Sequence, residues 1–245
     1  MDRAARLALL VLLPACAGRQ APPAPAAAAG PAAPDWAVDL QAAFEAEDWP
    51  GAEAIVTRAL AGEATSPADR SFALFVRSYT HLQQGDGEAE KADLVECIGI
   101  LRGMALPPGE EGADLRLRLR TSEIILAAGP ASLDPAVAAG VAAAVPVLIV
   151  PQEYLFLGRT RCGPDLAGVY ERTVQHLAEE GGHSYDVLEA TCTAGGGART
   201  FWFGVDVWLG ALTFGLGEGG LPDVVREAGF DEEGARFLVE KGISL

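Results

Sequence analysis

The stretch YDVLEATCTAGGGARTFWFGVDV, residues 185–207, decides the fold class. Its two halves, Tyr185 to Cys192 and Arg199 to Val207, alternate large apolar side chains with smaller or polar ones. Such a period of two, with β-branched and aromatic residues, is typical of strands with one buried face. The connection, Thr193 to Ala198, is rich in turn residues. We therefore predict a β-hairpin.

A lone hairpin is only marginally stable in water, so neighbouring segments must cover it. The apolar runs of residues 148–157 predict a third strand. A segment that starts at Asp165, runs through Leu177 and stops at a glycine pair predicts a helix over one face of the sheet. Pro222 to Gly229 and Asp231 to Gly242 predict two short terminal helices.

Between these last segments, residues 204–220 combine glycines with large apolar side chains. Core packing is the favoured interpretation, and a partner-binding or membrane-dipping loop is the alternative. Asp206 and Glu218 argue against a membrane span within this segment.

From Asp35 to Val145 the pattern is helical, broken by glycine and proline. Six helices are predicted, with a strand period as the alternative at the start of the fifth, where leucine and arginine alternate. They cover residues 35–46, 50–62, 67–85, 92–103, 112–128 and 135–145. The predicted class is α+β, mainly α: stacked helical hairpins followed by a small C-terminal unit with a β-hairpin and helices.

The segment EDWPGAEAIVTRAL, residues 47–60, resembles the second half of a tetratricopeptide repeat. Ala52, Val56 and the pair Ala59-Leu60 fall at the spacing of that motif. The resemblance implies helix pairs that bury their apolar faces by stacking. A regular period of 34 residues is not present, and an irregular antiparallel bundle is the alternative.

The segments HSYDVLE, residues 183–189, and RTFWF, residues 199–203, are similar to a unit of uncharacterised bacterial exported proteins. That resemblance implies no activity.

The chain begins MDRAARLALLVLLPAC, in which Arg3 and Arg6 precede an apolar run of seven residues. This order is typical of a secretory signal, and the run is far shorter than the roughly 20 residues of a membrane span. Leu13-Pro14-Ala15-Cys16 resembles a lipobox, which implies a lipid on Cys16 of the mature protein. An ordinary signal peptide or a cytoplasmic protein are the alternatives.

The segment that follows consists almost entirely of Ala, Pro and Gly, a composition that cannot form a packed core. The sequence therefore predicts four parts: a signal peptide (1–15), a tether (16–34), a helical repeat-like domain (35–145) and a small α+β domain (146–245). Ala17 stands where an Asp would favour the inner membrane by resemblance to enterobacterial sorting, so the outer membrane is expected.

The formal net charge of −16 and the 50% content of hydrophobic residues limit the possible classes of function. The apolar content is sufficient for a substantial core. The negative charge is repelled by phosphate backbones and anionic lipid surfaces, so nucleic-acid binding is disfavoured.

Four cysteines are present, and three remain if Cys16 carries lipid. A disulfide is chemically permitted outside the cytoplasm, and Cys162 with Cys192 is the candidate pair. Spacing alone leaves open whether the pair forms. Cys97 lies in an apolar helical segment and is interpreted as a small buried hydrophobe.

No catalytic, cofactor-binding or metal-ligating residue is predicted. His81, His176 and His183 are too far apart in sequence for a typical zinc site, and His81 is interpreted as a solvated or capping residue. His183 with Asp186 and Cys192 could form a thiol nucleophile set only if the strand bent, because nine extended residues span about 30 Å. Gly195 to Gly197 are interpreted as a flexible turn. The adjacent pairs Glu110-Glu111 and Glu179-Glu180 are interpreted as solvated charge.

These observations predict a non-catalytic lipoprotein, anchored to the membrane through Cys16 and binding another envelope protein. The alternative is an envelope hydrolase or ligand-binding lipoprotein with a pocket between its two domains.

Overall fold

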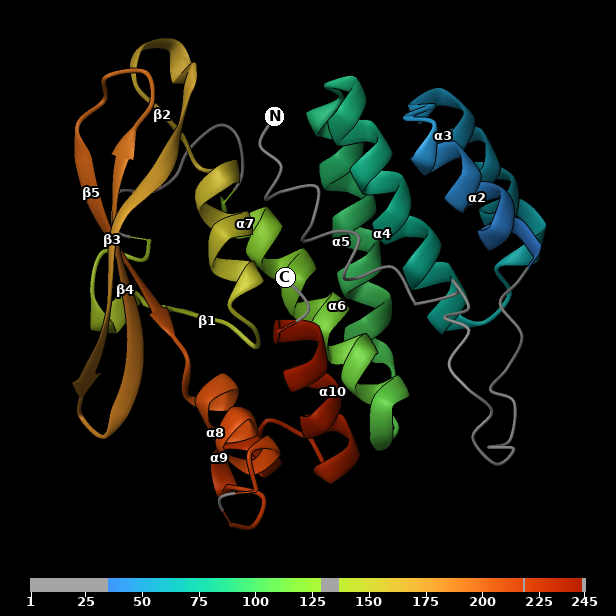
Figure 1. Cartoon of the computed structure of the whole chain (residues 1–245). Helices are drawn as coiled ribbons and strands as arrows, with labels where there is room; N and C mark the ends of the chain where they lie inside the picture. The colour runs from blue at the N-terminus through green and yellow to red at the C-terminus, as the bar shows by residue number, and fades with distance from the viewer. Residues whose placement is uncertain (1–34, 129–136, 218, 244–245) are drawn as a thin grey trace. The chain divides into compact units, whose positions relative to one another are not determined.

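A computed structural model describes residues 35–128, 137–217 and 219–243, and its class is α+β, mainly α, as predicted (Figure 1). Cys16, the signal and the tether lie outside the described residues. The chain divides between Ile100 and Leu101 into two compact units, a helical unit and a unit that contains the sheet. The predicted four-part division stays a prediction.

From residue 35 on, where the structure describes it, the helical unit contains four helices with the capping signals that the sequence carries, the last of which extends three residues into the second unit. They are α2 (Asp35–Glu45), α3 (Trp49–Arg58) with a π-helical turn (Ala59–Glu63), α4 (Pro67–Gln84) and α5 (Gly87–Gly103). The side chains of Asp48 and Ser66 accept hydrogen bonds from the amides of Gly51 and Asp69 at the starts of α3 and α4. Gly85 ends α4 in the left-handed conformation, with φ of 80°.

Aromatic side chains fill the core of the helical unit. The rings of Phe44 and Tyr79 stack with centroids 5.8 Å apart, and Trp49 meets both rings edge-on. Ala52 and Ala59 are fully buried, which lets neighbouring helices approach closely. The residues that resemble a tetratricopeptide repeat are thus core residues, and membership of that family stays a prediction.

The second unit begins with α6 (Gly109–Ala128), so the alternating Leu and Arg residues belong to a helix. Two of these arginines have partners nearby: Arg118 pairs with Asp114, with Nη2 2.5 Å from Oδ2, and Arg120 donates to Glu123 and to the carbonyl of Pro146. Charged heads that reach partners allow leucines and arginine stems to be buried on the same helix. The prediction of a helix over residues 112–128 is confirmed.

Five strands form one sheet in the order β1-β5-β4-β3-β2. They are β1 (Val145–Pro146), β2 (Arg161–Cys162), β3 (Gly168–Glu180), β4 (His183–Cys192) and β5 (Ala198–Gly204). β1 runs parallel to β5 and the other pairs are antiparallel. The predicted hairpin is present as β4 and β5, with Leu188 opposite Phe201.

The helix predicted from Asp165 to Leu177 is wrong, because β3 occupies most of that range. The apolar residues Val169, Tyr170, Val174 and Leu177 fit a helical period, but β4 supplies their segment with a strand partner. Gly181 and Gly182 both have positive φ, 63° and 83°, so they form a tight β-turn instead of a helix stop.

The third strand predicted within residues 148–157 is also wrong, because α7 (Pro151–Arg159) lies there. Pro151 stands in the first turn, where its missing amide hydrogen is tolerated. Phe156 packs edge-on against Phe201 and Phe203 with centroids 6.1 and 5.6 Å away, so α7 covers one face of the sheet (Figure 1). The covering helix therefore comes from a different segment than predicted.

In the described part of the segment predicted as a sixth helix, 137–145, the chain forms turns, a 3₁₀ turn (Val141–Ala143) and the start of β1. This prediction is wrong because the segment binds the edge of β5. The carbonyl of Ala138 accepts a hydrogen bond from the amide of Trp202 at 2.8 Å, and that of Val137 accepts one from Arg199 at 2.6 Å.

The chain ends in α8 (Asp206–Gly215), α9 (Asp223–Glu227) and α10 (Glu232–Ile243), and a 3₁₀ turn (Pro164–Leu166) precedes β3. The last two helices match the prediction, whereas α8 was not predicted. Trp208 of α8 is buried against Gly242, where a Cβ would lie 2.2 Å from the ring. Among the described residues, no helix is both long and apolar enough to cross a membrane.

Candidate functional site

A polar cluster lies under α7, on the sheet face that this helix covers. Glu153 of α7 is fully buried, and Asp186 of β4 is 7% exposed. Phe203 lies opposite Asp186 on β5, so the two acids adjoin the aromatic core. Two carboxyl groups within a packed core are unusual, because transfer of an ionised carboxylate out of water is costly.

Three further side chains surround the pair at the β3 side. Gln175 donates its amide to Asp186, and Arg172 donates to both Gln175 and the Tyr154 hydroxyl. The Tyr154 hydroxyl also lies 3.1 Å from Oε1 of Gln175, and the Arg172 guanidinium lies 5.0 Å from the centre of the Tyr154 ring. Asp186 is therefore hydrogen-bonded.

Glu153 differs from Asp186 in this respect. No donor group among the described residues reaches either of its carboxyl oxygens. Burial first, and then the charge of the Asp186 carboxylate and a hydrogen bond with it, raise the pKa of Glu153 to about 9, while Arg172 opposes the shift. Glu153 therefore carries a proton at neutral pH. Because the side chain has no exposed surface, a substrate cannot reach this acid, and its chemistry is to hold a proton.

Beside this cluster, β3 forms an open edge of the sheet. β4 pairs with β3 from Tyr170 to Glu180, while β2 pairs on the other side with Gly168 and Val169 alone. Within the described part of the chain, no strand covers the outer edge from residue 170 to 180. We call these eleven residues the β3 edge. Its backbone amides and carbonyls that point away from β4 can bind an added strand.

Two apolar side chains of the β3 edge face solvent. Val174 is 47% exposed and Leu177 is 56% exposed, although most large apolar residues of this unit are buried. A β-bulge between Arg172 and Val174 shifts the register at this point. Such a bulge re-aims the following side chains, which is common near sites of function.

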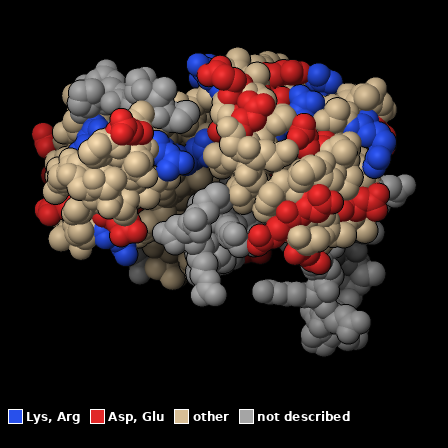
Figure 2. Space-filling model, turned by 90° about the horizontal axis from the view of Figure 1, so that it is seen from above, with Lys and Arg blue, Asp and Glu red and all other residues tan. Residues whose placement is uncertain are grey.

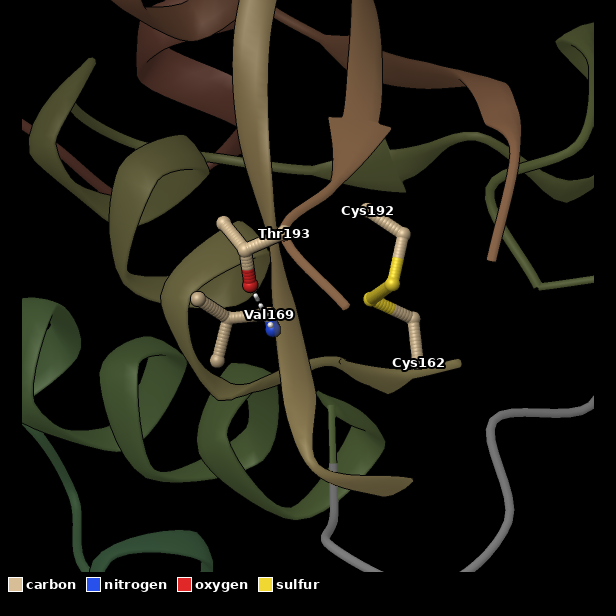
Figure 3. The surroundings of a disulfide bond; sticks show 4 residues. All are labelled: Cys162, Val169, Cys192 and Thr193. Carbon is tan, nitrogen blue, oxygen red and sulfur yellow. Dashed lines mark hydrogen bonds between the residues drawn. A yellow bond between two sulfur atoms is a disulfide. The ribbon is translucent and has the colours of Figure 1, made fainter. Parts of the chain in front are cut away.

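A disulfide joins Cys162 of β2 to Cys192 at the end of β4, with the Cα atoms 5.9 Å apart (Figure 3). Next to it, the Val169 amide donates to the Thr193 hydroxyl at 3.0 Å. The bond and this contact tie the start of β3 to β4. Cys97 is buried and lies outside this bond, with its thiol 3.3 Å from the carbonyl oxygen of Ser71.

The thiol nucleophile set is not assembled. Cys192 is in the disulfide, and Asp186 lies in the cluster under α7. His183 instead places Nδ1 2.7 Å from Asp206 at the start of α8, and the amide of Ser184 donates to the same carboxylate. His183, Asp186 and Cys192 therefore take part in three separate sets of contacts.

The other histidines have different surroundings. His81 was interpreted as solvated or capping, and its carbonyl does accept hydrogen bonds from the amides of Gly85 and Asp86. Its ring, however, is 14% exposed and lies between the carboxylates of Glu53 and Asp93, at 4.0 and 3.5 Å. His176 is exposed on the β3 edge. Among the described residues, no group of three potential metal ligands comes together.

The remaining sequence candidates lie in separate places. Gly195 to Gly197 form the turn between β4 and β5, with two of the three at positive φ. The adjacent glutamate pairs at 110–111 and 179–180 are exposed. Figure 2 shows that acidic side chains gather at the surface, as expected for solvated charge.

A surface pocket of about 360 Å³ lies beside α6 and β1. Its charged lining residues are engaged with one another: Glu123 accepts from both Arg102 and Arg120, at 2.7 and 2.9 Å. This pairing leaves no converging set of free polar groups for a ligand.

The polar cluster was not predicted, because a strand was expected over the segment that contains Glu153, which forms α7 instead. The spacing of Glu153, Phe156 and Leu157 places them on one face of a helix. Pro151 just before them is a helix-start signal. These two signals could have located Glu153 on an inward face.

Comparison of the chain with protein-family models, with curated proteins and with solved structures finds no match. Function must therefore be inferred from this chain's own residues.

Proposed function

We propose that this protein is a bacterial lipoprotein, exported and anchored in the outer membrane through Cys16, which binds another protein of the cell envelope. The signal-like N-terminus, the lipobox-like Leu13 to Cys16 and the Ala/Pro tether support export and anchoring. The Cys162–Cys192 disulfide supports the same compartment, because disulfides persist in oxidising environments.

The observation that carries the binding function is the β3 edge. An exposed edge with open backbone groups is the usual receptor for an extended peptide, which adds as a further strand. Edges are normally protected because they invite such pairing. Here the edge is long and displays Val174 and Leu177, which supports a role in binding a partner.

Anchoring is tested by mass spectrometry of the native protein and of Cys16→Ala. The native chain should begin at Cys16 with attached acyl groups, and the variant should lack them. An intact, unmodified leader on the native protein would remove the lipoprotein proposal.

Partner binding is tested by placing a photo-crosslinking amino acid at Leu177 in cells that express the protein. The matched control places it at Val95 of α5, which is 54% exposed in the helical unit. Adducts to an envelope protein should form from Leu177 and not from Val95. Failure to form an adduct from Leu177 would contradict binding through this edge.

A further inference from the structure

We propose that the β3 edge accepts an extended segment whose ends carry positively charged side chains, contributed by a different protein. This inference rests on the proposed function and adds the chemistry of the partner. It is argued from the positions of charge along β3 and from the sheet register.

Side chains of β3 alternate between two faces of the sheet. The register places Val174, His176 and Ala178 on the face away from α7, with Glu171 before them and Glu180 after them. Glu189 of β4, also exposed, lies directly opposite Val174 on that face. On that face the exposed apolar side chain of Val174 thus lies on a strand that carries Glu171 and Glu180, with Glu189 beside it.

A second copy of the chain fits this edge poorly. In the antiparallel register that pairs Val174 with Ala178 of another copy, on the same face of the sheet, Glu171 lies opposite Glu180 at both ends. Like charges directly opposite each other destabilise a strand pair. Arg172 is the one basic side chain of the edge, and its guanidinium is engaged by Tyr154 and Gln175.

A segment from another protein avoids this repulsion if it carries lysine or arginine at the positions opposite Glu171 and Glu180. Opposite charges across strands stabilise the pair, and apolar residues between them can cover Val174. The net charge of −16 adds long-range attraction for a basic segment. Backbone hydrogen bonds then supply affinity and the flanking charges supply selectivity.

The test uses the protein as purified from cells and two fluorescent nine-residue peptides. Both alternate threonine and valine; one has lysine at each end and the other has glutamate. Fluorescence anisotropy should show the lysine peptide binding roughly tenfold more tightly at low salt, with the preference shrinking as salt is added.

Variants separate the backbone edge from the charges. The double variant Val174→Lys/Leu177→Lys should weaken binding of the lysine peptide by roughly tenfold or more, because it removes the exposed apolar side chain from each face of the edge and adds repulsion. The double variant Glu171→Gln/Glu180→Gln should bring the two peptides to similar affinity. Val95→Lys on the helical unit is the matched control and should change nothing.

Three outcomes would overturn the inference. They are absence of saturable binding by both peptides, equal binding of the two peptides to the unaltered protein, and a concentration-dependent dimer in sedimentation that Val174→Lys/Leu177→Lys abolishes. Any of these leaves the crosslinking experiment at Leu177 to decide the proposed function separately.

Discussion

Glu153 and Asp186 bring two carboxyl groups together in the interior, one from α7 and one from β4, and the two differ in their hydrogen bonding. Asp186 accepts a hydrogen bond from Gln175, while Glu153 has no such partner among the described residues. Burial of a carboxyl group beside a second carboxylate raises its pKa, so it keeps its proton to higher pH. Glu153 is the acid that keeps it.

This difference predicts a dependence of stability on pH. Glu153 has an ordinary pKa of 4.5 and a folded-state pKa of about 9. Between these values the folded state holds the extra proton, so the free energy of unfolding falls as pH rises. Glu153→Gln, which cannot ionise, should remove this fall and unfold at higher denaturant concentration than the native protein at pH 8. The gain should be about 1–3 kcal/mol.

Urea unfolding at pH 5, 7 and 9 measures both profiles. Glu110→Gln, at an exposed position of α6, is the control and should follow the native profile. Parallel profiles for Glu153→Gln and the native protein would contradict a buried, protonated Glu153.

The disulfide predicts sensitivity to reductant. Cys162→Ser/Cys192→Ser opens a loop with a sequence separation of 30 residues and should lower the free energy of unfolding by about 2–4 kcal/mol. Guanidinium unfolding with and without dithiothreitol measures this, and the double variant should no longer respond to dithiothreitol. Cys97→Ala is the control that keeps the response, because Cys97 takes no part in the Cys162–Cys192 bond.

A native protein that unfolds at the same guanidinium concentration in both conditions would contradict a stabilising Cys162–Cys192 bond. The same samples allow a free-thiol count on the oxidised, denatured chain. Titration of both Cys162 and Cys192 would contradict the bond itself.

In the helical unit, Arg77 and Asp93 form a two-fold hydrogen-bonded ion pair, with N–O distances of 2.6 and 2.8 Å. The hydrogen bond to Asp93 raises the pKa of Arg77 against the effect of burial. Asp93→Asn leaves a half-buried guanidinium without its carboxylate and should cost about 3 kcal/mol of stability.

Thermal unfolding followed by circular dichroism measures this cost. Glu96→Gln is the matched control, because it breaks the exposed pair with Arg70, whose side chains are 43% and 46% exposed. Exposed pairs contribute about 0–1 kcal/mol, so the control should unfold near the native temperature. Equal falls in unfolding temperature for Asp93→Asn and Glu96→Gln would contradict a larger contribution of the Arg77–Asp93 pair to stability.

The sequence by itself determined the helices of the first unit, the β4–β5 hairpin and the two terminal helices. Their signals are local: capping by Ser66, the left-handed Gly85 and the alternation around Phe201 act through neighbours a few residues away. Such local signals can be recognised in the sequence without knowledge of the fold.

The formation of β3, the role of α7 as the covering helix and the cluster beneath it depend on tertiary contacts. The residues from Val169 to Leu177 fit a helical period, and a strand resulted because β4 supplies hydrogen-bond partners along their length. Because β3 is a strand and not a helix, α7 is the helix that covers this face of the sheet, and it places Glu153 beside Asp186. Pairing between distant segments outweighs local propensity, which is why β3 and the contact between Glu153 and Asp186 could not be predicted from local patterns.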